Sequence, residues 1–255
     1  MKIREYLIET VKLNTDLRAC VVSDIHSMPY DKCLRAIEST RADVIICAGD
    51  MLERLDGLRD EDNRLGFEFL SKLSKIAPTY YAFGNHERFG SHRETVKREA
   101  DAPEITPLNM ERLIATGVVL VNDDYAEYTI GDNKILIGGL MPADDRTLDI
   151  PNIELVRRFS ELDAFKILIS HQPEYYDEYL KDRDLDLIVS GHTHGGQWKL
   201  FGRGVYAPNQ GLFPRYSSGI YDKRLVVSAG ASNPERFIPR IFNPCEIIIL
   251  NIKSI

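Results

Sequence analysis

A chain of 255 residues with 44% hydrophobic and 28% charged residues has the composition of an ordinary soluble globular protein. Its formal net charge of −7 argues against a surface that binds nucleic acid through bulk positive charge. The four cysteines are scattered without a C-x-x-C pair, which indicates free thiols in a reducing compartment rather than a disulfide framework.

No run of the sequence approaches 18 apolar residues, so no transmembrane helix is expected. The first six residues carry charges where a secretory signal needs an apolar stretch. We therefore expect a cytoplasmic protein, with peripheral contact to a membrane as the alternative. No repeat or linker divides the chain, and one domain is predicted over residues 1–255. We expect the N-terminal segment to form a short element that packs on the core. One face of this element would consist of Ile3, Tyr6, Leu7, Val11 and Leu13.

The first half of the chain alternates apolar runs with helical patterns. Apolar runs at residues 18–23, 43–48 and 78–83 predict buried strands, and helical spacing predicts helices at 30–40 and 65–73 between them. This order implies a parallel sheet with right-handed crossovers. Ligands of such sheets bind beyond the carboxyl ends of the strands.

Polar residues stand at each of these strand ends. Asp24 and His26 follow the first strand, and because residues i and i+2 of a strand point to the same face, we expect the two side chains to aim at one point. Asp50 follows the second strand. Asn85 and His86 follow the third.

The second half of the chain predicts a further sheet. Gly131-Asp132-Asn133 between the runs 124–130 and 134–140 is a hairpin signal, which indicates a more antiparallel arrangement. A strand at 166–170 ends in His171, and a strand at 185–190 leads into the glycine-rich turn of His192 and His194. The other predicted elements are helices at 106–116, 151–162 and 174–180, and strands at 118–121, 224–229 and 245–252.

Two histidines one residue apart in a turn are consistent with ordinary loop residues. Histidine is also the commonest metal ligand, through its neutral ring nitrogen. Five of the six histidines lie just after a short apolar run, and only His92 does not. This distribution favours a metal site.

Collected, the strand ends supply two carboxylates, four imidazoles and one amide. One metal ion would leave several of these groups unused, whereas two ions that share a carboxylate would use them all; Asp50 is the natural bridge, because a carboxylate has two oxygens. Nitrogen and oxygen ligands without thiolate suit Mn, Fe, Zn or Ni better than calcium. Two ions about 3.5–4 Å apart form a clamp for in-line displacement at phosphorus. The seven residues are Asp24, His26, Asp50, Asn85, His171, His192 and His194.

The motifs occur in the order D-x-H, G-D, G-N-H-E, H and G-H-x-H. From Asp24 to His194 this series resembles the calcineurin-like metallophosphoesterase superfamily. The resemblance implies an α/β fold of four layers, in which two mixed β-sheets form a sandwich flanked by helices. It also implies a metal-dependent phosphoric ester hydrolase with two divalent metal ions.

The resemblance further implies two ligand sets. The first ion would be held by Asp24, His26, Asp50 and His194. The second would be held by Asp50, Asn85, His171 and His192.

His86 would lie outside both ligand sets and act as the general acid to the leaving oxygen, or contact the phosphate. Many relatives have an aspartate three residues after the bridging aspartate, and it orients this histidine. This chain has Glu53 there. Glu53 is therefore a catalytic candidate, with a solvated surface carboxylate as the alternative.

The turn from Gly191 to Gln197 resembles a branch whose members are often membrane-associated and act on phosphodiesters, some of them lipid-linked. We do not expect this chain to carry the N-terminal membrane segment that many of those proteins have. We therefore expect a phosphodiesterase, in which metal-bound hydroxide attacks phosphorus in line in a small-molecule or lipid-linked substrate. The alternatives are a phosphomonoesterase, a non-catalytic metal-binding scaffold and a protein whose metal is structural.

Other residues are candidates for contact with substrate. Arg88 and His92 follow the G-N-H-E motif and, with Asn85, could meet a phosphate; a charged exposed helix is the alternative for this segment. Arg236 and Arg240 are expected to make surface ion pairs. Five aromatic residues could line a pocket that stacks on a base or acyl group, or could pack over the sheet edge: Trp198, Phe201, Tyr206, Phe213 and Tyr216.

Overall fold

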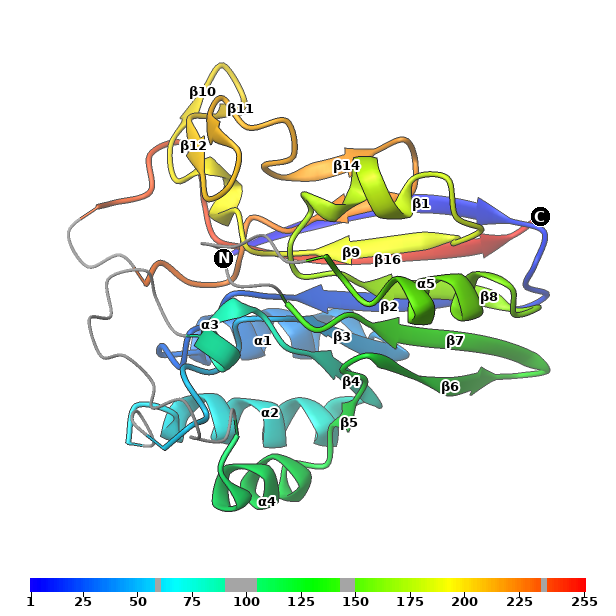
Figure 1. Ribbon diagram of the computed structural model, residues 1–255, viewed down its shortest axis with the longest axis horizontal. Coiled ribbons are helices and arrows are strands. Elements are labelled where there is room, and N and C mark those ends of the chain that lie inside the picture. Colours follow the sequence, from blue (N-terminus) through cyan, green and yellow to red (C-terminus); the bar gives the residue numbers. More distant parts are fainter. Residues whose placement is uncertain (58–60, 90–104, 143–149, 235–237) are drawn as a thin grey trace.

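The computed structural model describes residues 1–57, 61–89, 105–142, 150–234 and 238–255. Two six-stranded β-sheets lie face to face, and helices pack against the outer face of each (Figure 1). This arrangement confirms the predicted α/β class and the four-layer sandwich of two mixed sheets flanked by helices.

The first sheet has the strand order β1-β16-β2-β3-β4-β5. Strands β2 to β5 run parallel, as the alternation of strands and helices predicts, and β16 pairs antiparallel to β2. The first strand of the chain, β1, pairs parallel to the last strand, β16. The bounds are β1 (Lys2–Thr10), β16 (Glu246–Ser254), β2 (Leu17–Val22), β3 (Val44–Ala48), β4 (Thr79–Ala82) and β5 (Val119–Leu120).

Three helices pack on the outer face of this sheet, and all three were predicted from the sequence. In the second of them, Phe69, Leu70 and Leu73 face the strands and are fully buried. The third is capped by Thr106, whose hydroxyl accepts a hydrogen bond from the backbone N–H of Asn109 at 3.2 Å. The helices are α1 (Asp31–Thr40), α2 (Arg64–Ile76) and α4 (Pro107–Ala115).

The second sheet has the strand order β14-β15-β9-β8-β7-β6. Its four inner strands run parallel, and the pairs at its two edges, β14 with β15 and β6 with β7, are antiparallel. The predicted hairpin at residues 124–140 is one of these edges. Helix α5 (Ile153–Ser160) and the short π-helix η1 (Tyr176–Leu180) cover its outer face. The strands are β14 (Gly219–Tyr221), β15 (Leu225–Val227), β9 (Leu187–Ser190), β8 (Phe165–Ile169), β7 (Asn133–Gly139) and β6 (Asp124–Ile130).

The central core lies between the two sheets. Val21 and Ile46 of the first sheet belong to the same buried cluster as Ile167 and Val189 of the second. Every residue of β3 and β8 is buried, on the inner and outer faces alike. This double burial explains why β3 is a continuous apolar run in the sequence and why β8 is apolar except for the buried Lys166, which is paired with Asp184.

The prediction of one apolar face for the N-terminal segment is wrong. The segment forms β1, in which Ile3 and Leu7 are 41% and 63% exposed, whereas Tyr6 and Ile8 pack against the central core. Successive residues of a strand point to opposite faces, so Tyr6 cannot share a face with Leu7.

Two short helices at the edge of the sheets, α3 (Asn85–Phe89) and η2 (His194–Gly196), were not predicted. Residues 199–212 form two small antiparallel pairs that project beside the second sheet (Figure 1). They are β10 (Lys199–Leu200) with β11 (Arg203–Gly204), and β12 (Tyr206–Ala207) with β13 (Gly211–Leu212).

Most of the segment 89–102, predicted as a charged loop or helix, lies outside the described residues. Within the described ranges, no helix combines the length and the apolarity that crossing a membrane requires.

Candidate metal centre

The predicted metal ligands all follow strands whose carboxyl ends meet at one edge of the sandwich. Three of the strands belong to the first sheet and two to the second. Parallel neighbours bring their carboxyl ends to the same edge, so positions far apart in the sequence become adjacent. After β2, β3, β4, β8 and β9 stand, in that order, Asp24 with His26, Asp50, Asn85, His171, and His192 with His194.

Asp24 and His26 point together for a different reason from the one that the sequence suggested. Strand β2 ends at Val22, and the two residues have left-handed backbone, with φ angles of 55° and 50°. A strand pleat therefore does not align them. Asp50, His192 and His194 are also left-handed, with φ between 48° and 71°. Such conformations are uncommon for residues other than glycine and cluster at functional sites.

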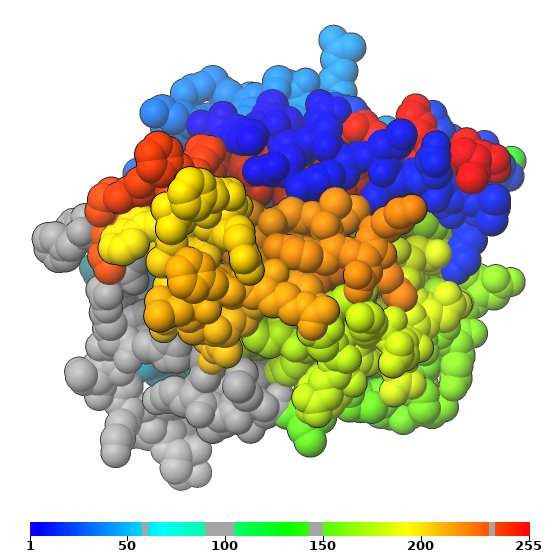
Figure 2. All heavy atoms as spheres, turned by 90° about the horizontal axis from the view of Figure 1, so that it is seen from above, coloured from blue at the N-terminus to red at the C-terminus, as the bar shows by residue number. Residues whose placement is uncertain are grey.

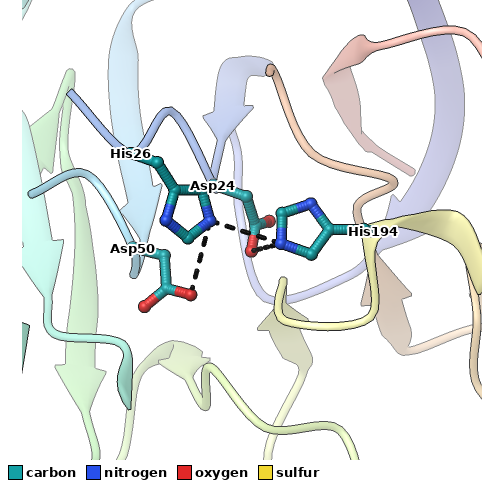
Figure 3. A group of neighbouring side chains, drawn as sticks. All are labelled: Asp24, His26, Asp50 and His194. Atoms are coloured by element: carbon teal, nitrogen blue, oxygen red, sulfur yellow. Dashed lines mark hydrogen bonds and ion pairs between the residues drawn. The ribbon is translucent and has the colours of Figure 1, made fainter. Parts of the chain in front are cut away.

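Four side chains form a first group of donor atoms. One atom from each of Asp24, His26, Asp50 and His194 lies within 4.8 Å of the others. The Nε2 atoms of His26 and His194 are 3.3 Å apart, and each lies 3.7 Å from a carboxylate oxygen, of Asp50 and Asp24 respectively. Figure 3 shows the four side chains directed into a common space. This spacing suits a divalent ion between them.

A second group of donor atoms consists of Asp50, His171 and His192. His171 Nε2 lies 3.2 Å from Asp50 Oδ2, and Asn85 Oδ1 lies 3.2 Å from His171 Nε2 and 3.0 Å from His192 Nδ1. His171 Nδ1 is 2.7 Å from the carbonyl oxygen of Ala48, which makes it the N–H donor. Nε2, which faces Asp50, is then the nitrogen that offers an electron pair to a metal ion once its proton is lost.

Asp50 belongs to both groups. Its Oδ2 faces His26 and His171, and its Oδ1 accepts the backbone N–H of His86 at 2.9 Å. Burial would raise the pKa of Asp50, but the imidazoles of His171 and His86 outweigh burial and hold the pKa well below its usual range. Asp50 is therefore an ionised carboxylate between two sets of donors.

The two groups differ in electrostatic character. Burial would lower the pKa of His171, but Asp50 and then Asp24 raise it to about 10. Burial lowers the pKa of His194 well below its ordinary value, and the neighbouring His26 and Arg240 add to this effect. A cation that binds beside Asp50 therefore displaces a proton from His171.

The donor set fits divalent metal ions. Asp24 is fully buried, and its Oδ2 has no hydrogen-bond partner among the described residues. A buried carboxylate oxygen without a partner is costly, and a cation beside it removes that cost. Imidazole, carboxylate and amide donors without thiolate suit Mn, Fe, Zn or Ni.

His86 and Glu53 form a pair next to the first group. His86 Nδ1 lies 2.9 Å from Glu53 Oε2, and the other oxygen of Glu53 lies 3.4 Å from His26 Nδ1. The side chains of His86 and Glu53 are 17% and 14% exposed, whereas those of His26 and Asp50 are at most 2% exposed. Glu53 is therefore not a solvated surface carboxylate, and the pair lies on the side of the centre that solvent reaches.

The charges of this pair reinforce each other. Burial would lower the pKa of His86, but the carboxylates of Asp50 and Glu53 raise it to about 10. Burial would raise the pKa of Glu53, but His86 and His26 lower it to about 2. At neutral pH the pair is an imidazolium and a carboxylate, and Nε2 of His86 carries a proton that it can donate.

Glu87 supports the centre, a role that its membership of the G-N-H-E motif did not predict. Its buried carboxylate accepts backbone N–H groups of Asp50, Met51, Leu52 and Gly84 at 2.6–3.0 Å. These bonds tie the turn after β3 to the turn after β4 and so place Asp50 beside α3. This structural role of Glu87 depends on how the two turns pack together, which the sequence does not show.

Replacing Glu87 with alanine is expected to lower the free energy of unfolding by about 3–5 kcal/mol, because several buried N–H groups lose their acceptor. Urea denaturation followed by circular dichroism measures this loss. Glu111→Ala, at an exposed position of α4, is the matched control and should change stability by at most about 0.5 kcal/mol. Equal stability of both variants would contradict the supporting role of Glu87.

Arg240 does not make the predicted surface ion pair. Its guanidinium donates to the carbonyl oxygens of Ala229 and Ser232, and its Nη2 lies 3.1 Å from His194 Nδ1. An arginine N–H can only donate, so this contact requires an unprotonated His194 Nδ1. The prediction failed because the fold returns residues 238–243 against the turn after β9. Arg236 lies outside the described residues.

The predicted substrate contacts are only partly placed. Asn85 lies in the second donor group, whereas the guanidinium of Arg88 donates to the carbonyl oxygen of Pro142 at 3.0 Å and lies over the ring of Phe89. His92 lies outside the described residues. Among the five aromatic candidates, Tyr216 is buried, whereas Trp198, Phe201, Tyr206 and Phe213 are 43–97% exposed.

The chain is similar to known proteins over the stretch that contains the motifs from Asp24 to His194. The family model of calcineurin-like phosphoesterases matches residues 17–196. An uncharacterized metallophosphoesterase of Campylobacter jejuni is 29% identical over 265 residues, which cover 97% of this chain and 62% of the relative. A putative metallophosphoesterase of Caenorhabditis elegans is 28% identical over 251 residues, which cover 92% of this chain and 48% of the relative.

The chain thus spans 62% and 48% of the length of these two relatives. Among solved structures, the NAD nucleotidase of Haemophilus influenzae matches 71% of this chain and 39% of its own, with a TM-score of 0.45 and 14% sequence identity.

Proposed function

The chain belongs to the calcineurin-like phosphoesterase family, and from this premise we propose that it is a dinuclear metal-dependent phosphodiesterase. The observation that supports two ions is the position of Asp50, which belongs to both groups of donor atoms. A carboxylate has two oxygens, so Asp50 can serve both ions at once.

We assign the first ion to Asp24, His26, Asp50 and His194, and the second to Asp50, Asn85, His171 and His192. Two bound divalent ions would supply the Lewis acidity that polarises a phosphoryl group and activates water for in-line attack. The left-handed turns and the hydrogen bonds of Glu87 hold the donors in place.

His86 supplies the proton in this proposal. Glu53 orients the ring through Nδ1, so Nε2 is the atom that can protonate the leaving oxygen. The same imidazolium stabilises negative charge that develops on the phosphoryl group. In this proposal the side chains of the protein supply the general acid, the carboxylate that orients it and the donor atoms for the two ions.

Two considerations favour a diester over a monoester. The glycine-rich turn after β9 resembles that of phosphodiesterases. A diester also carries one negative charge where a monoester carries up to two. Two arginines near the centre in the described part of the chain are engaged elsewhere: Arg240 donates to two backbone carbonyls and Arg88 to that of Pro142.

The proposal is tested by hydrolysis of a chromogenic phosphodiester beside the matching monoester, with Mn²⁺ and with a chelator. We expect turnover of the diester that requires the metal and stops with the chelator. Turnover of the monoester alone would reassign the protein as a phosphatase. Absence of any turnover, with two ions bound per chain, would favour a metal-binding scaffold.

A further inference from the structure

Three phenylalanines stand at backbone positions that usually belong to glycine or asparagine. Phe201, Phe213 and Phe242 have φ angles of 49°, 54° and 54°. Phe201 and Gly202 form the two-residue turn between β10 and β11, where positive φ at both residues favours an Asn-Gly pair. A bulky aromatic residue at such a position is strained, and strain of this kind points to a function.

These side chains are also exposed to solvent. Phe201 is 97% exposed, Phe242 is 86% exposed and Phe213 is 53% exposed. Neither backbone conformation nor packing therefore accounts for an aromatic residue at these turns. Asparagine would fit the left-handed backbone better, and its polar side chain would be compatible with exposure to solvent.

The exposed phenylalanines belong to one continuous surface, which we call the aromatic corner. The backbone N–H of Lys199 donates to the carbonyl oxygen of Ile241 at 2.9 Å, and the indole N–H of Trp198 donates to that of Pro239 at 2.9 Å. These bonds join residues 198–213 to residues 238–242. Figure 2 shows the yellow segment near residue 200 beside the orange-red segment near residue 240. The exposed members are Trp198, Leu200, Phe201, Tyr206, Leu212, Phe213, Ile241 and Phe242.

The aromatic corner is positively charged in a chain of net charge −7. Residues 198–213 contain Lys199 and Arg203 and no aspartate or glutamate, whereas the nearby Arg215 is paired with Asp177 at 2.6 Å. Lys199 also lies within electrostatic range of Lys2, Arg4 and Arg240, with Glu246 as the acidic neighbour. Basic groups around projecting aromatic side chains complement an anionic surface that has an apolar interior.

The aromatic corner adjoins the metal centre. Trp198 stands four residues after His194, and Arg240, which contacts His194, immediately precedes Ile241. Whatever binds the corner is therefore brought next to the donor groups.

We propose that the aromatic corner docks the protein onto a bilayer that contains anionic phospholipid. Single phenylalanines at the tips of separate turns can enter a fluid interface one by one, with tyrosine and tryptophan at headgroup level. A rigid protein partner would instead need a pocket for each projecting ring. Docking is independent of the proposed hydrolysis, because it uses none of the donor residues.

The test measures co-sedimentation of the full chain with phosphatidylcholine vesicles, with and without phosphatidylglycerol. We expect binding to the mixed vesicles. F201N/F242N should weaken vesicle binding by about a hundredfold, since each phenyl ring that the bilayer would bury contributes about tenfold to the affinity. Asparagine suits both left-handed turns, so this variant should keep its fold and its hydrolysis of a soluble diester. R203Q should weaken binding by about fivefold, and added salt should weaken it further.

The matched control is L108Q/I114Q, which removes two exposed apolar side chains from α4 and should bind vesicles like the wild type. Three results would overturn the proposal. They are wild-type binding no stronger to mixed than to pure phosphatidylcholine vesicles, unchanged binding of F201N/F242N, and a dimer in sedimentation velocity that F201N/F242N abolishes. The last result would assign the corner to a second copy of the chain.

Discussion

Replacing Asp50 with asparagine is expected to lower kcat for the metal-dependent reaction by about a thousandfold or more, equivalent to about 4 kcal/mol of transition-state stabilisation. Asp50 is the ionised group that both donor groups share, with Oδ2 facing His26 and His171. Asparagine removes the negative charge and can turn an NH₂ group toward these imidazoles. Both ions should therefore bind more weakly and lose their common ligand.

The fold should survive this change, because asparagine has the same shape and its oxygen can still accept the backbone N–H of His86. The measurement combines kcat at saturating Mn²⁺, the number of ions bound by calorimetry, and the melting temperature without metal. Asp132→Asn is the matched control: it makes the same chemical change in the exposed turn of the β6–β7 hairpin and should leave all three quantities unchanged. Near wild-type turnover of Asp50→Asn would contradict the two-ion proposal.

Replacing His86 with glutamine is expected to lower kcat by about 10²–10⁴-fold on a diester with an alkoxide leaving group. A poor leaving group needs the proton that His86 carries. An activated aryl leaving group departs without it, so the loss there should be closer to tenfold. Comparison of the two substrates in wild type and His86→Gln measures this difference, and equal losses on both would contradict the role of general acid.

Glu53→Gln provides the companion test. The Glu53 carboxylate helps to raise the pKa of His86. Activity that depends on the protonated imidazole is present below this pKa and is lost as pH rises through it. Removing the carboxylate lowers the pKa, so the alkaline limb of the pH profile should move to lower pH. A limb that stays in place would show that Glu53 does not act on His86.

The residues of the proposed centre could be predicted because their positions follow from strand topology. Asp24, Asp50 and His171 each stand directly after an apolar run, and parallel strands bring such positions to one edge. The alternation of strands and helices is a local pattern, so the sequence carried enough information to place the ligands near one another. The backbone that aims them was missed, since aspartate and histidine are enriched at left-handed φ angles too weakly to identify Asp24 and His26 in advance.

Contacts between distant segments could not be predicted in the same way. Glu87 tying the turns after β3 and β4, and Arg240 reaching His194, depend on how loops return to the centre. The pairing of β1 with β16 joins residues more than 240 positions apart, and neither strand has a pattern that names its partner. For each of these, many partners are compatible with the local sequence, and only the packed chain selects one.

The aromatic residues after the glycine-rich turn are a further case in which the sequence did not determine the environment of the side chains. Their composition indicated a pocket or a packed edge, and the structure exposes most of them instead. The order of motifs in the sequence by itself indicated the family and, through that resemblance, the layered α/β class, and the positions after the apolar runs indicated the candidate donor residues. Only the tertiary structure decided which side chains are buried, shared or exposed, because burial depends on what the rest of the chain places against each residue.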